Sequence, residues 1–247
     1  MTVHLVGAGP GDPELLTVRA ARLIASADVI VHDWLADVAI LDLARPGTEL
    51  IDVGKRPGRP TPQEMINALL VHLGAQGLEV VRLKGGDPYV FGRGGEEADA
   101  LKSAGIPFDV VPGVTSAVGV PAAAGVPVTH RGVSVGFTVV TGHREKGGAS
   151  SINWEALAAV GGTIVVLMGV AERAVIAARL MAGGLAADTP VAAVRYGTRP
   201  EQTTVRTTLV DLATTELESP CTIVIGAVAA FDLSPTAAST WEREAAR

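Results

Sequence analysis

A glycine-dense loop is the part of this sequence best suited to chemistry. It reads Lys84-Gly-Gly-Asp-Pro-Tyr-Val-Phe-Gly-Arg-Gly-Gly-Glu-Glu97. Glycine lets the backbone approach a ligand closely and take positive φ angles. Asp87 supplies a fixed acceptor behind Gly85 and Gly86, and Pro88 restricts the chain that follows. A plain strand-to-helix connection needs far fewer such residues, so we predict that this loop lies flat against a small polar molecule.

Polar and small residues also follow most of the other predicted strands. They are Asp33, Lys55-Arg56, Thr115-Ser116, His143, Met168-Gly169 and Tyr196-Gly197-Thr198. In an open α/β sheet, ligands bind in the crevice at the carboxyl ends of the strands. We therefore expect these residues to converge there. Thr115 has an alternative role, because it can serve only as the N-cap of the helix that follows it.

The first glycine turn, from Gly7 to Asp12, is a poor dinucleotide fingerprint. That fingerprint has the spacing G-x-G-x-x-G, whereas here Asp12 stands at the third glycine position and Pro10 interrupts the turn. A carboxylate at the start of a helix would also repel a bound pyrophosphate. The sequence thus argues against a nucleotide-phosphate site and is compatible with a glycine-lined wall for an uncharged or cationic ligand.

Basic residues gather near these loops although the net charge of the chain is −6. That net charge argues against a nucleic-acid partner, but not against a small anionic substrate, for which the local lining matters more. Arginine side chains bind carboxylates through two parallel hydrogen bonds. Lys55 and Arg56 follow a predicted strand directly, which favours a place in the site. For Arg59, Arg144 and Lys146, a solvated surface position is the better interpretation.

Strand-like and helix-like segments alternate along the whole chain, which is typical of an α/β fold. Helices are predicted from Asp12, with Pro13 at the first helical position, from a capping box formed by Thr61 and Glu64, and over 96–104 and 171–181. The predicted strands are 3–6, 28–31, 50–53, 80–83, 108–111, 135–140, 163–168, 190–196, 203–208 and 221–225. High apolar content, 48%, fits buried parallel strands covered by helices. We expect an N-terminal α/β domain over 1–113, a C-terminal α/β domain over 114–233 and a flexible tail over 234–247.

The single cysteine, Cys221, lies in an apolar run and is expected to be a buried structural thiol. One cysteine cannot form an internal disulfide, which suits a reducing cytoplasm. The scattered histidines show no metal-ligand spacing, so no metal site is expected. The sequence shows no signal peptide and no apolar run long enough to span a membrane, so no membrane association is expected.

Four motifs resemble those of the tetrapyrrole methylases. They are Val6-Gly-Ala-Gly-Pro-Gly-Asp-Pro-Glu-Leu-Leu-Thr17, Arg82-Leu-Lys-Gly-Gly-Asp-Pro-Tyr-Val-Phe-Gly-Arg-Gly94, Val111-Pro-Gly-Val-Thr-Ser-Ala117 and Gly125-Val-Pro-Val-Thr-His-Arg131. The resemblance extends from about residue 3 to residue 231. Within the family, the long central motif is most similar to the branch that methylates uroporphyrinogen III.

The resemblance implies a two-domain tetrapyrrole methylase fold with the cofactor cleft between the domains, in a homodimer. The cofactor it implies is S-adenosyl-L-methionine, which is released as S-adenosyl-L-homocysteine. S-adenosylmethionine has no phosphate group, in agreement with the conclusion that the first glycine turn does not bind a phosphate. The family's cofactor contacts fall on Pro10, Gly85, Gly86, Asp87, Val90, Thr115, Ser116, Met168, Gly197 and Ala227.

The resemblance also implies the catalytic residues and the reaction. Asp33 takes the position of a proton acceptor and Lys55 that of a proton donor, although a lysine can instead pair with a substrate carboxylate. Uroporphyrinogen III carries carboxylate side chains, for which Arg56, Arg93 and Arg131 are the expected partners, and Arg195 or Arg199 further candidates. The expected product is precorrin-2, methylated at C2 and C7, for sirohaem or cobalamin synthesis by separate downstream dehydrogenase and chelatase proteins.

Two other functions remain as alternatives. A methylase of a later corrin precursor would share the cofactor site and differ in its substrate lining. A non-catalytic sensor of S-adenosylmethionine or of a tetrapyrrole would have no need of Asp33 or Lys55, and both are present.

Overall fold

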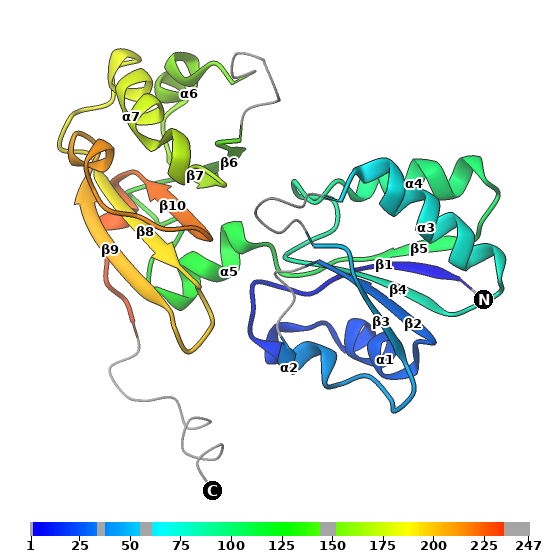
Figure 1. Ribbon diagram of the computed structural model, residues 1–247. Coiled ribbons are helices and arrows are strands. Elements are labelled where there is room, and N and C mark those ends of the chain that lie inside the picture. Colours follow the sequence, from blue (N-terminus) through cyan, green and yellow to red (C-terminus); the bar gives the residue numbers. More distant parts are fainter. Residues whose placement is uncertain (1, 34–37, 55–60, 144–151, 235–247) are drawn as a thin grey trace, which may run out of the picture. The chain divides into compact units, whose positions relative to one another are not determined.

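The structure is a computed structural model that describes residues 2–33, 38–54, 61–143 and 152–234. The chain divides into two compact units, Met1–Ser116 and Ala117–Arg247, near the junction expected after residue 113 (Figure 1). Each unit contains one five-stranded sheet. The two-domain α/β fold expected from the sequence is thus confirmed.

The first sheet is entirely parallel. Its strands are β1 (Val3–Gly7), β2 (Val29–His32), β3 (Glu49–Asp52), β4 (Val80–Lys84) and β5 (Phe108–Val111), in the order β3-β2-β4-β1-β5. Because all five strands run the same way, the loops that follow them emerge at one edge of the sheet. β1 and β4 lie side by side in the middle of the sheet and are buried along their whole length.

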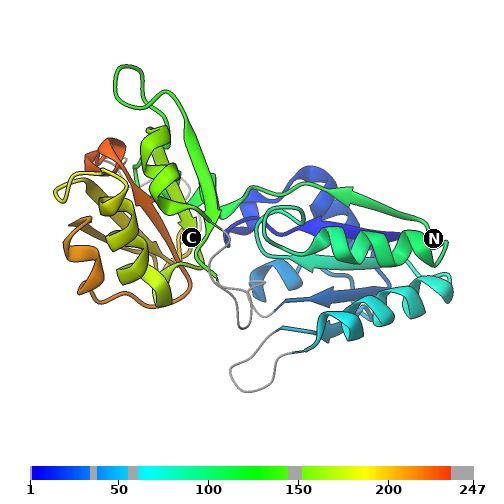
Figure 2. The same cartoon turned by 90° about the horizontal axis from the view of Figure 1, so that it is seen from above.

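Helices cover both faces of this sheet. Helices α1 (Val18–Ser26) and α2 (Val38–Leu41) lie on one face, and α3 (Gln63–Ala75) and α4 (Gly94–Ser103) lie side by side on the other (Figure 1; Figure 2). Alternate residues of the strands supply the two cores, since side chains alternate across a strand. Leu5 packs toward α3 and α4, whereas Val6 packs toward α1.

The second sheet is mixed. Its strands are β6 (Phe137–Thr141), β7 (Thr163–Leu167), β8 (Pro190–Arg195), β9 (Thr203–Thr208) and β10 (Cys221–Ile225), in the order β6-β7-β10-β8-β9. β10 pairs antiparallel with both β7 and β8, and β9 pairs antiparallel with β8. β6, β7 and β8 therefore point the same way and end at a common edge. The expectation of parallel strands holds for the first sheet, although its edge strand β3 is largely exposed, but it is wrong for three of the four strand pairings in the second.

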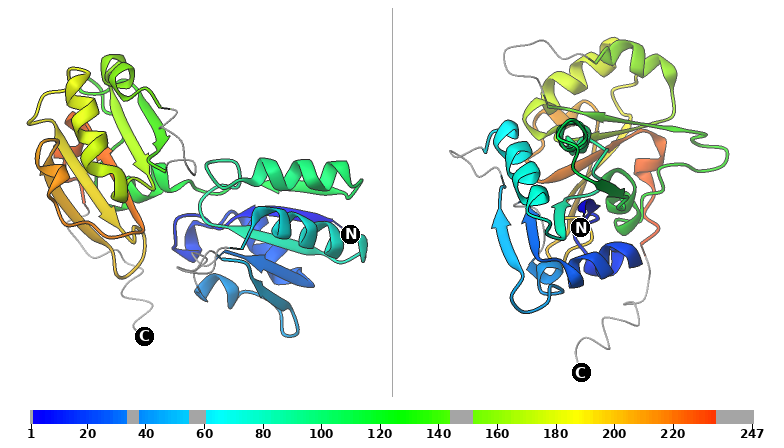
Figure 3. Two further views of the ribbon diagram at one scale, coloured as in Figure 1. Left: turned by 45° about the horizontal axis from the view of Figure 1, so that its top comes forward. Right: turned by 90° about the vertical axis from the view of Figure 1, so that its right-hand side faces the viewer.

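Helices also pack on both faces of the second sheet. Helices α6 (Trp154–Val160) and α7 (Arg173–Ala182) cover one face, and α5 (Ser116–Ala123) packs its Val120 against the other (Figure 3). The described residues also form the short 3-10 turns η1 (Pro13–Leu15), η2 (Val170–Glu172), η3 (Asp211–Ala213) and η4 (Ala227–Ala230). No helix in the described part of the chain is long and apolar enough to cross a membrane.

Two predicted helix starts are wrong in detail. Asp12 does cap a helical turn, accepting from the amide of Glu14 at 2.8 Å, but that turn is a 3-10 helix of three residues. The chain then becomes extended, and Thr17 caps α1 in a second start. The expected capping box at 61–64 does not form, because Pro62 is the N-cap of α3 and its side chain has no acceptor.

Part of the sequence-based interpretation lies outside the described residues. This applies to Lys55, Arg56, Arg59, Arg144 and Lys146, and to the tail from residue 235 onward.

Candidate functional site

Three loops meet in close backbone contact at the carboxyl edge of the first sheet. Gly9 and Gly86 exchange backbone hydrogen bonds of 3.1 Å and 2.7 Å, which joins the loop after β1 to the loop after β4. A Cβ atom on Gly113, after β5, would lie 2.3 Å from the Gly86 carbonyl oxygen and 2.8 Å from Gly7 Cα. Gly7 and Gly113 leave no room for a side chain, and Gly86 has the positive φ that favours glycine; we call these three residues the glycine junction (Gly7, Gly86, Gly113).

The carboxylate of Asp87 fastens the same loops together. It accepts from the Tyr89 amide at 2.8 Å and from the Gly113 amide at 3.1 Å. An ideal Cβ on Gly86, which has a φ of +67°, would lie 3.6 Å from the Ser116 amide nitrogen and 3.8 Å from Thr115 Cα. The structure therefore brings the predicted residues Gly86, Asp87, Thr115 and Ser116 together, and Asp87 organises the loops rather than simply facing a ligand.

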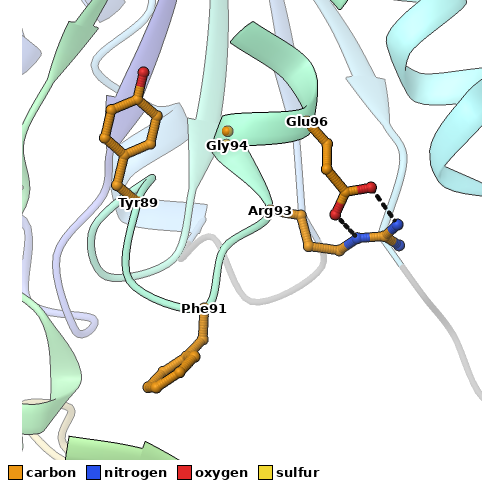
Figure 4. A pocket seen from close by; sticks show the side chains of 6 residues that line it. Tyr89, Phe91, Arg93, Gly94 and Glu96 are labelled. Carbon is orange, nitrogen blue, oxygen red and sulfur yellow. Dashed lines mark hydrogen bonds and ion pairs between the residues drawn. The ribbon is translucent and has the colours of Figure 1, made fainter. Parts of the chain in front are cut away.

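The rest of the glycine-rich loop is conformationally strained. Phe91 and Arg93 take left-handed conformations, with φ of 54° and 59°, which non-glycine residues adopt at a cost of about 1 kcal/mol or more. This loop shapes a shallow hollow of about 380 Å³ at the start of α4, and Figure 4 shows side chains that line it. The lining residues are Tyr89, Phe91, Arg93, Gly94, Gly95 and Glu96.

The predicted substrate ligand Arg93 is already paired in this hollow. Its guanidinium donates to both oxygens of Glu96, at 2.7 Å and 2.6 Å (Figure 4). This hydrogen bonding raises the pKa of Arg93 against a smaller opposing effect of burial. Because both side chains are well exposed, the pair contributes little stability and can exchange for another carboxylate.

A second charged cluster lies beneath the loop and is buried. Arg82 and Lys84 lie two residues apart on β4 and face α3 and α4. Both donate hydrogen bonds to the Glu97 carboxylate of α4, Arg82 at 3.0 Å and Lys84 at 2.9 Å. Glu97 has no exposed side-chain surface, and Arg82 and Lys84 have 2% each. Burial lowers the pKa of Lys84, and the neighbouring Arg82 adds to that effect. Unpaired buried charges are very unfavourable, so these groups depend on one another.

Asp33 lies at the outer end of this cluster. It follows β2, and its Oδ1 receives a 2.5 Å hydrogen bond from Arg82 Nη2. The Asp33 side chain is 33% exposed, so it is accessible from solvent while its partner is not. The sequence predicted Asp33 but missed Arg82 and Glu97. The available signal was the pair of basic residues at alternate positions of an otherwise apolar strand.

In the second unit, the common edge of β6, β7 and β8 carries another group of strained residues. Met168, directly after β7, and Tyr196 and Thr198, after β8, have φ of 56°, 50° and 71°. Between the last two, a Cβ on Gly197 would lie 2.4 Å from Val120 Cγ1 of α5. Strained left-handed residues cluster at binding and active sites, which favours the predicted roles of Met168 and Gly197.

Ala227 lies elsewhere on this sheet. Because β10 is antiparallel to β7 and β8, its last residue, Ile225, pairs with Ile164 and Val191 near the beginnings of those strands. Ala227 follows that end, whereas Met168 and Gly197 follow the opposite ends of β7 and β8. The structure does not bring Ala227 to their edge, and its proposed role rests on the resemblance alone.

The remaining predicted residues occupy loops. Pro10 is half-buried in the loop after β1, Val90 is half-buried in the glycine-rich loop, and Arg131 is exposed before β6. Among the described residues, no group of three His, Cys, Asp or Glu side chains is placed to hold a metal ion.

The chemistry of the glycine junction fits S-adenosylmethionine better than a phosphate ligand. The backbone amides of Gly9, Gly86 and Gly113 already donate within these loops, and the carboxylates of Asp12 and Asp87 lie on the same loops. Carboxylates near the ligand tolerate a positive sulfonium and disfavour a pyrophosphate.

Comparison with known proteins gives concordant results. A family profile described as Tetrapyrrole (Corrin/Porphyrin) Methylases matches residues 2–213. The chain is 51% identical over 232 residues to the S-adenosyl-L-methionine-dependent uroporphyrinogen III methyltransferase of Methanosarcina barkeri, covering 92% of this chain and 91% of that protein. It is 48% identical over 234 residues to the uroporphyrinogen-III C-methyltransferase of Paracoccus denitrificans, covering 93% of this chain and 82% of that protein.

A solved structure is similar over nearly the same length. The crystal structure of uroporphyrin-III C-methyl transferase from Thermus thermophilus complexed with S-adenyl homocysteine superposes with a TM-score of 0.81 at 43% sequence identity. The match covers 93% of this chain and 94% of that one.

Proposed function

This chain belongs to the tetrapyrrole methylase family, and from that premise we propose that it is the S-adenosylmethionine-dependent methyltransferase that converts uroporphyrinogen III to precorrin-2. Methyl groups are added at C2 and C7, and S-adenosylhomocysteine is the second product. Within the structure, the observation that carries the proposal is a carboxylate one third exposed, Asp33, at the sheet edge where the glycine junction lies.

The reaction needs no covalent enzyme nucleophile, because an electron-rich pyrrole carbon attacks the methyl group itself. When bound, S-adenosylmethionine supplies a methyl group activated by its sulfonium. The protein aligns the two reactants, and such alignment can contribute about 7–11 kcal/mol to catalysis. The ring gains a positive charge with the methyl group, and a proton must leave the tetrapyrrole to restore neutrality.

Asp33 is the proposed acceptor of that proton. Its carboxylate is open to solvent on one side and hydrogen-bonded to Arg82 on the other. A carboxylate placed within hydrogen-bond reach of the released proton typically contributes about 10²–10⁴-fold to the rate. Lys55 is the proposed proton donor or, alternatively, a partner of a substrate carboxylate.

Cofactor and substrate residues follow the same assignment. The residues proposed to contact the cofactor are Pro10, Gly85, Gly86, Asp87, Val90, Thr115, Ser116, Met168, Gly197 and Ala227. Those proposed to pair with substrate carboxylates are Arg56, Arg93 and Arg131. Arg93 supports this role because its carboxylate-binding fork is exposed and already holds Glu96.

The proposed setting is a homodimer in the cytoplasm, with precorrin-2 passed to separate dehydrogenase and chelatase proteins on the way to sirohaem or to cobalamin. The single cysteine fits such a reducing compartment.

A substrate panel tests the proposed reaction. Initial rates of methyl transfer from labelled S-adenosylmethionine are compared for uroporphyrinogen III and for methylated corrin precursors under anaerobic conditions. The proposal requires the highest kcat/KM for uroporphyrinogen III. A preference for a later precursor would instead identify a sibling methylase, and binding without any transfer would identify a sensor.

A further inference from the structure

We propose that Arg82 is a positioning residue for methyl transfer: it holds the Asp33 carboxylate in its working orientation and is itself fixed by Glu97. The inference rests on the proposed function, in which Asp33 accepts the proton. It adds two buried residues that touch neither reactant and act through Asp33.

The guanidinium of Arg82 has a single well-determined orientation. Nε donates to Glu97 Oε1 at 3.0 Å, and Nη1 donates to the carbonyl oxygens of Leu83 and Val31 at 3.1 Å and 3.3 Å. Nη2 donates to Asp33 Oδ1 at 2.5 Å. Each of its three nitrogens thus has an acceptor, so rotating the fork toward another partner would break several buried hydrogen bonds.

Glu97 anchors this arrangement from the helix side. Its Oε1 accepts from Arg82, from Lys84 at 2.9 Å and from the Gln63 amide at 3.2 Å. The carboxylate is fully buried, so exchange with water does not compete with these bonds. Through these hydrogen bonds Glu97 of α4 connects β4, which carries Arg82, to α3.

Charge balance explains why Arg82 can be buried at all. Arg82 and Lys84 face Glu97 and Asp33, so two cations meet two anions. Burial by itself would lower the pKa of Arg82, but the Asp33 and Glu97 carboxylates more than offset this and raise it. Arg82 is thus a permanent cation that keeps Asp33 as its fourth partner.

Among the described residues, Arg82 is the side chain that fixes the Asp33 carboxylate. The Asp33 backbone amide donates to Leu83 O at 3.3 Å, a long bond that positions the main chain but not the side chain. The side chain is 33% exposed, and an exposed carboxylate without a partner would sample several rotamers. Arg82 takes one oxygen and leaves part of the carboxylate surface accessible to a substrate.

A double-mutant cycle on the turnover number tests the proposal. Wild type, Arg82→Gln, Asp33→Asn and the double variant are compared for kcat, for KM of uroporphyrinogen III and for the Kd of S-adenosylhomocysteine. We expect Arg82→Gln to lower kcat about 10- to 100-fold, as a misplaced catalytic group does, with KM and Kd changed less than about threefold. On the Asp33→Asn background, the same substitution should change kcat less than about twofold, because the group it positions is already disabled.

Losses that multiply in the double variant would overturn the proposal, since Arg82 would then act independently of Asp33. Wild-type kcat in Arg82→Gln would overturn it as well. If Asp33→Asn keeps full activity, the tether has no catalytic role even though the proposed reaction stands. If the wild-type protein fails to methylate uroporphyrinogen III, the proposed function itself is wrong and the inference falls with it.

Two further variants guard against loss of folding. Arg82→Lys keeps the charge but cannot bridge Asp33 and Glu97 through a planar fork. It should show the same non-additive pattern with Asp33→Asn if Arg82→Gln does not fold. Arg45→Gln removes an arginine from the exposed ion pair with Asp28 in the same unit and should leave kcat within about twofold of wild type.

Discussion

Single charged side chains in the first unit serve two different purposes. The buried group, formed by Arg82, Lys84 and Glu97, has partners inside the protein and fixes geometry. The exposed group, formed by Arg93 and Glu96, is hydrated and exchangeable. Only the second group is suited to contact a carboxylate-rich substrate directly, because its partners can be replaced without unpairing a buried charge.

Arg93→Ala should raise KM for uroporphyrinogen III about tenfold or more and leave kcat nearly unchanged. A charge-assisted hydrogen bond is worth about 1.5–3 kcal/mol, and this one is expected in the ground state and the transition state alike. Steady-state kinetics with varied tetrapyrrole concentration measures the effect. A fall in kcat with constant KM would contradict a substrate-binding role.

Glu96→Gln is the matched control for that experiment. It removes the negative charge that occupies the Arg93 fork in the free protein. We expect it to leave KM unchanged or to lower it. A rise in KM equal to that of Arg93→Ala would mean that the pair acts as a structural unit.

Cys221 should react slowly with thiol reagents in the native protein. Burial raises the pKa of its thiol to about 11, so the thiolate forms only in strong alkali. At pH 8 we expect labelling by a disulfide reagent to be about a hundredfold or more slower than in urea, where an ordinary thiol pKa returns. Cys221 is half-buried rather than fully buried, and equal rates in the two conditions would contradict its assignment as an unreactive thiol.

Individual residues differ in how far the sequence reveals them. Asp33 was predictable because it directly follows a strand, where ligand sites lie in α/β sheets. The pairing of Arg82 with Glu97 was not predictable, because it depends on the packing of α4 against β4, although two basic residues at alternate positions of β4 marked the strand. The ion pair between Arg93 and Glu96 could have been predicted, because residues three apart at the start of a helix lie close together.

Among the larger elements, the loops after β1, β4 and β5 depend on one another. Gly113→Ala should destabilise the first unit by about 1–3 kcal/mol, because the new Cβ would overlap the Gly86 carbonyl and Gly7. The displaced Gly86 loop should also bind S-adenosylhomocysteine more weakly. Urea unfolding and calorimetric titration measure the two effects.

Gly95→Ala provides the comparison within the same unit. A Cβ at Gly95 meets nothing within 4 Å, and the residue lies in the first turn of α4. Alanine there should be neutral or stabilise the helix by up to about 1 kcal/mol. If Gly95→Ala and Gly113→Ala destabilised the protein equally, close packing at the glycine junction would not explain the lower stability of Gly113→Ala.

Strands were easier to predict than helix starts, and particular residues show why. Buried strands such as β7 and β10 are largely apolar runs, which local sequence displays directly. The capping box at 61–64 failed because the helix begins one residue later, at Gln63, which puts Glu64 out of register. α6 was missed although Asn153 caps it, accepting from the Ala156 amide at 3.0 Å, because the helix is only seven residues long.

The molecule as a whole combines two α/β units of different topology. Alternation of strands and helices predicted the class but could not predict strand direction in the second sheet, where β10 inserts antiparallel between β7 and β8. The order of strands in a sheet is set by long-range pairing, which local patterns do not encode. Within the first unit, Gly86, Asp87, Thr115 and Ser116 lie together after parallel strands, whereas in the second unit Ala227 follows the antiparallel β10 and lies at the other edge of its sheet from Met168 and Gly197.

Counting the methyl groups added to one tetrapyrrole tests the central claim most directly. The wild-type protein is incubated anaerobically with uroporphyrinogen III and methyl-labelled S-adenosylmethionine, and the tetrapyrrole is analysed by mass spectrometry. The account predicts two labelled methyl groups per ring, located at C2 and C7, with S-adenosylhomocysteine formed in proportion. No labelled tetrapyrrole, from protein shown to bind the cofactor, would contradict it.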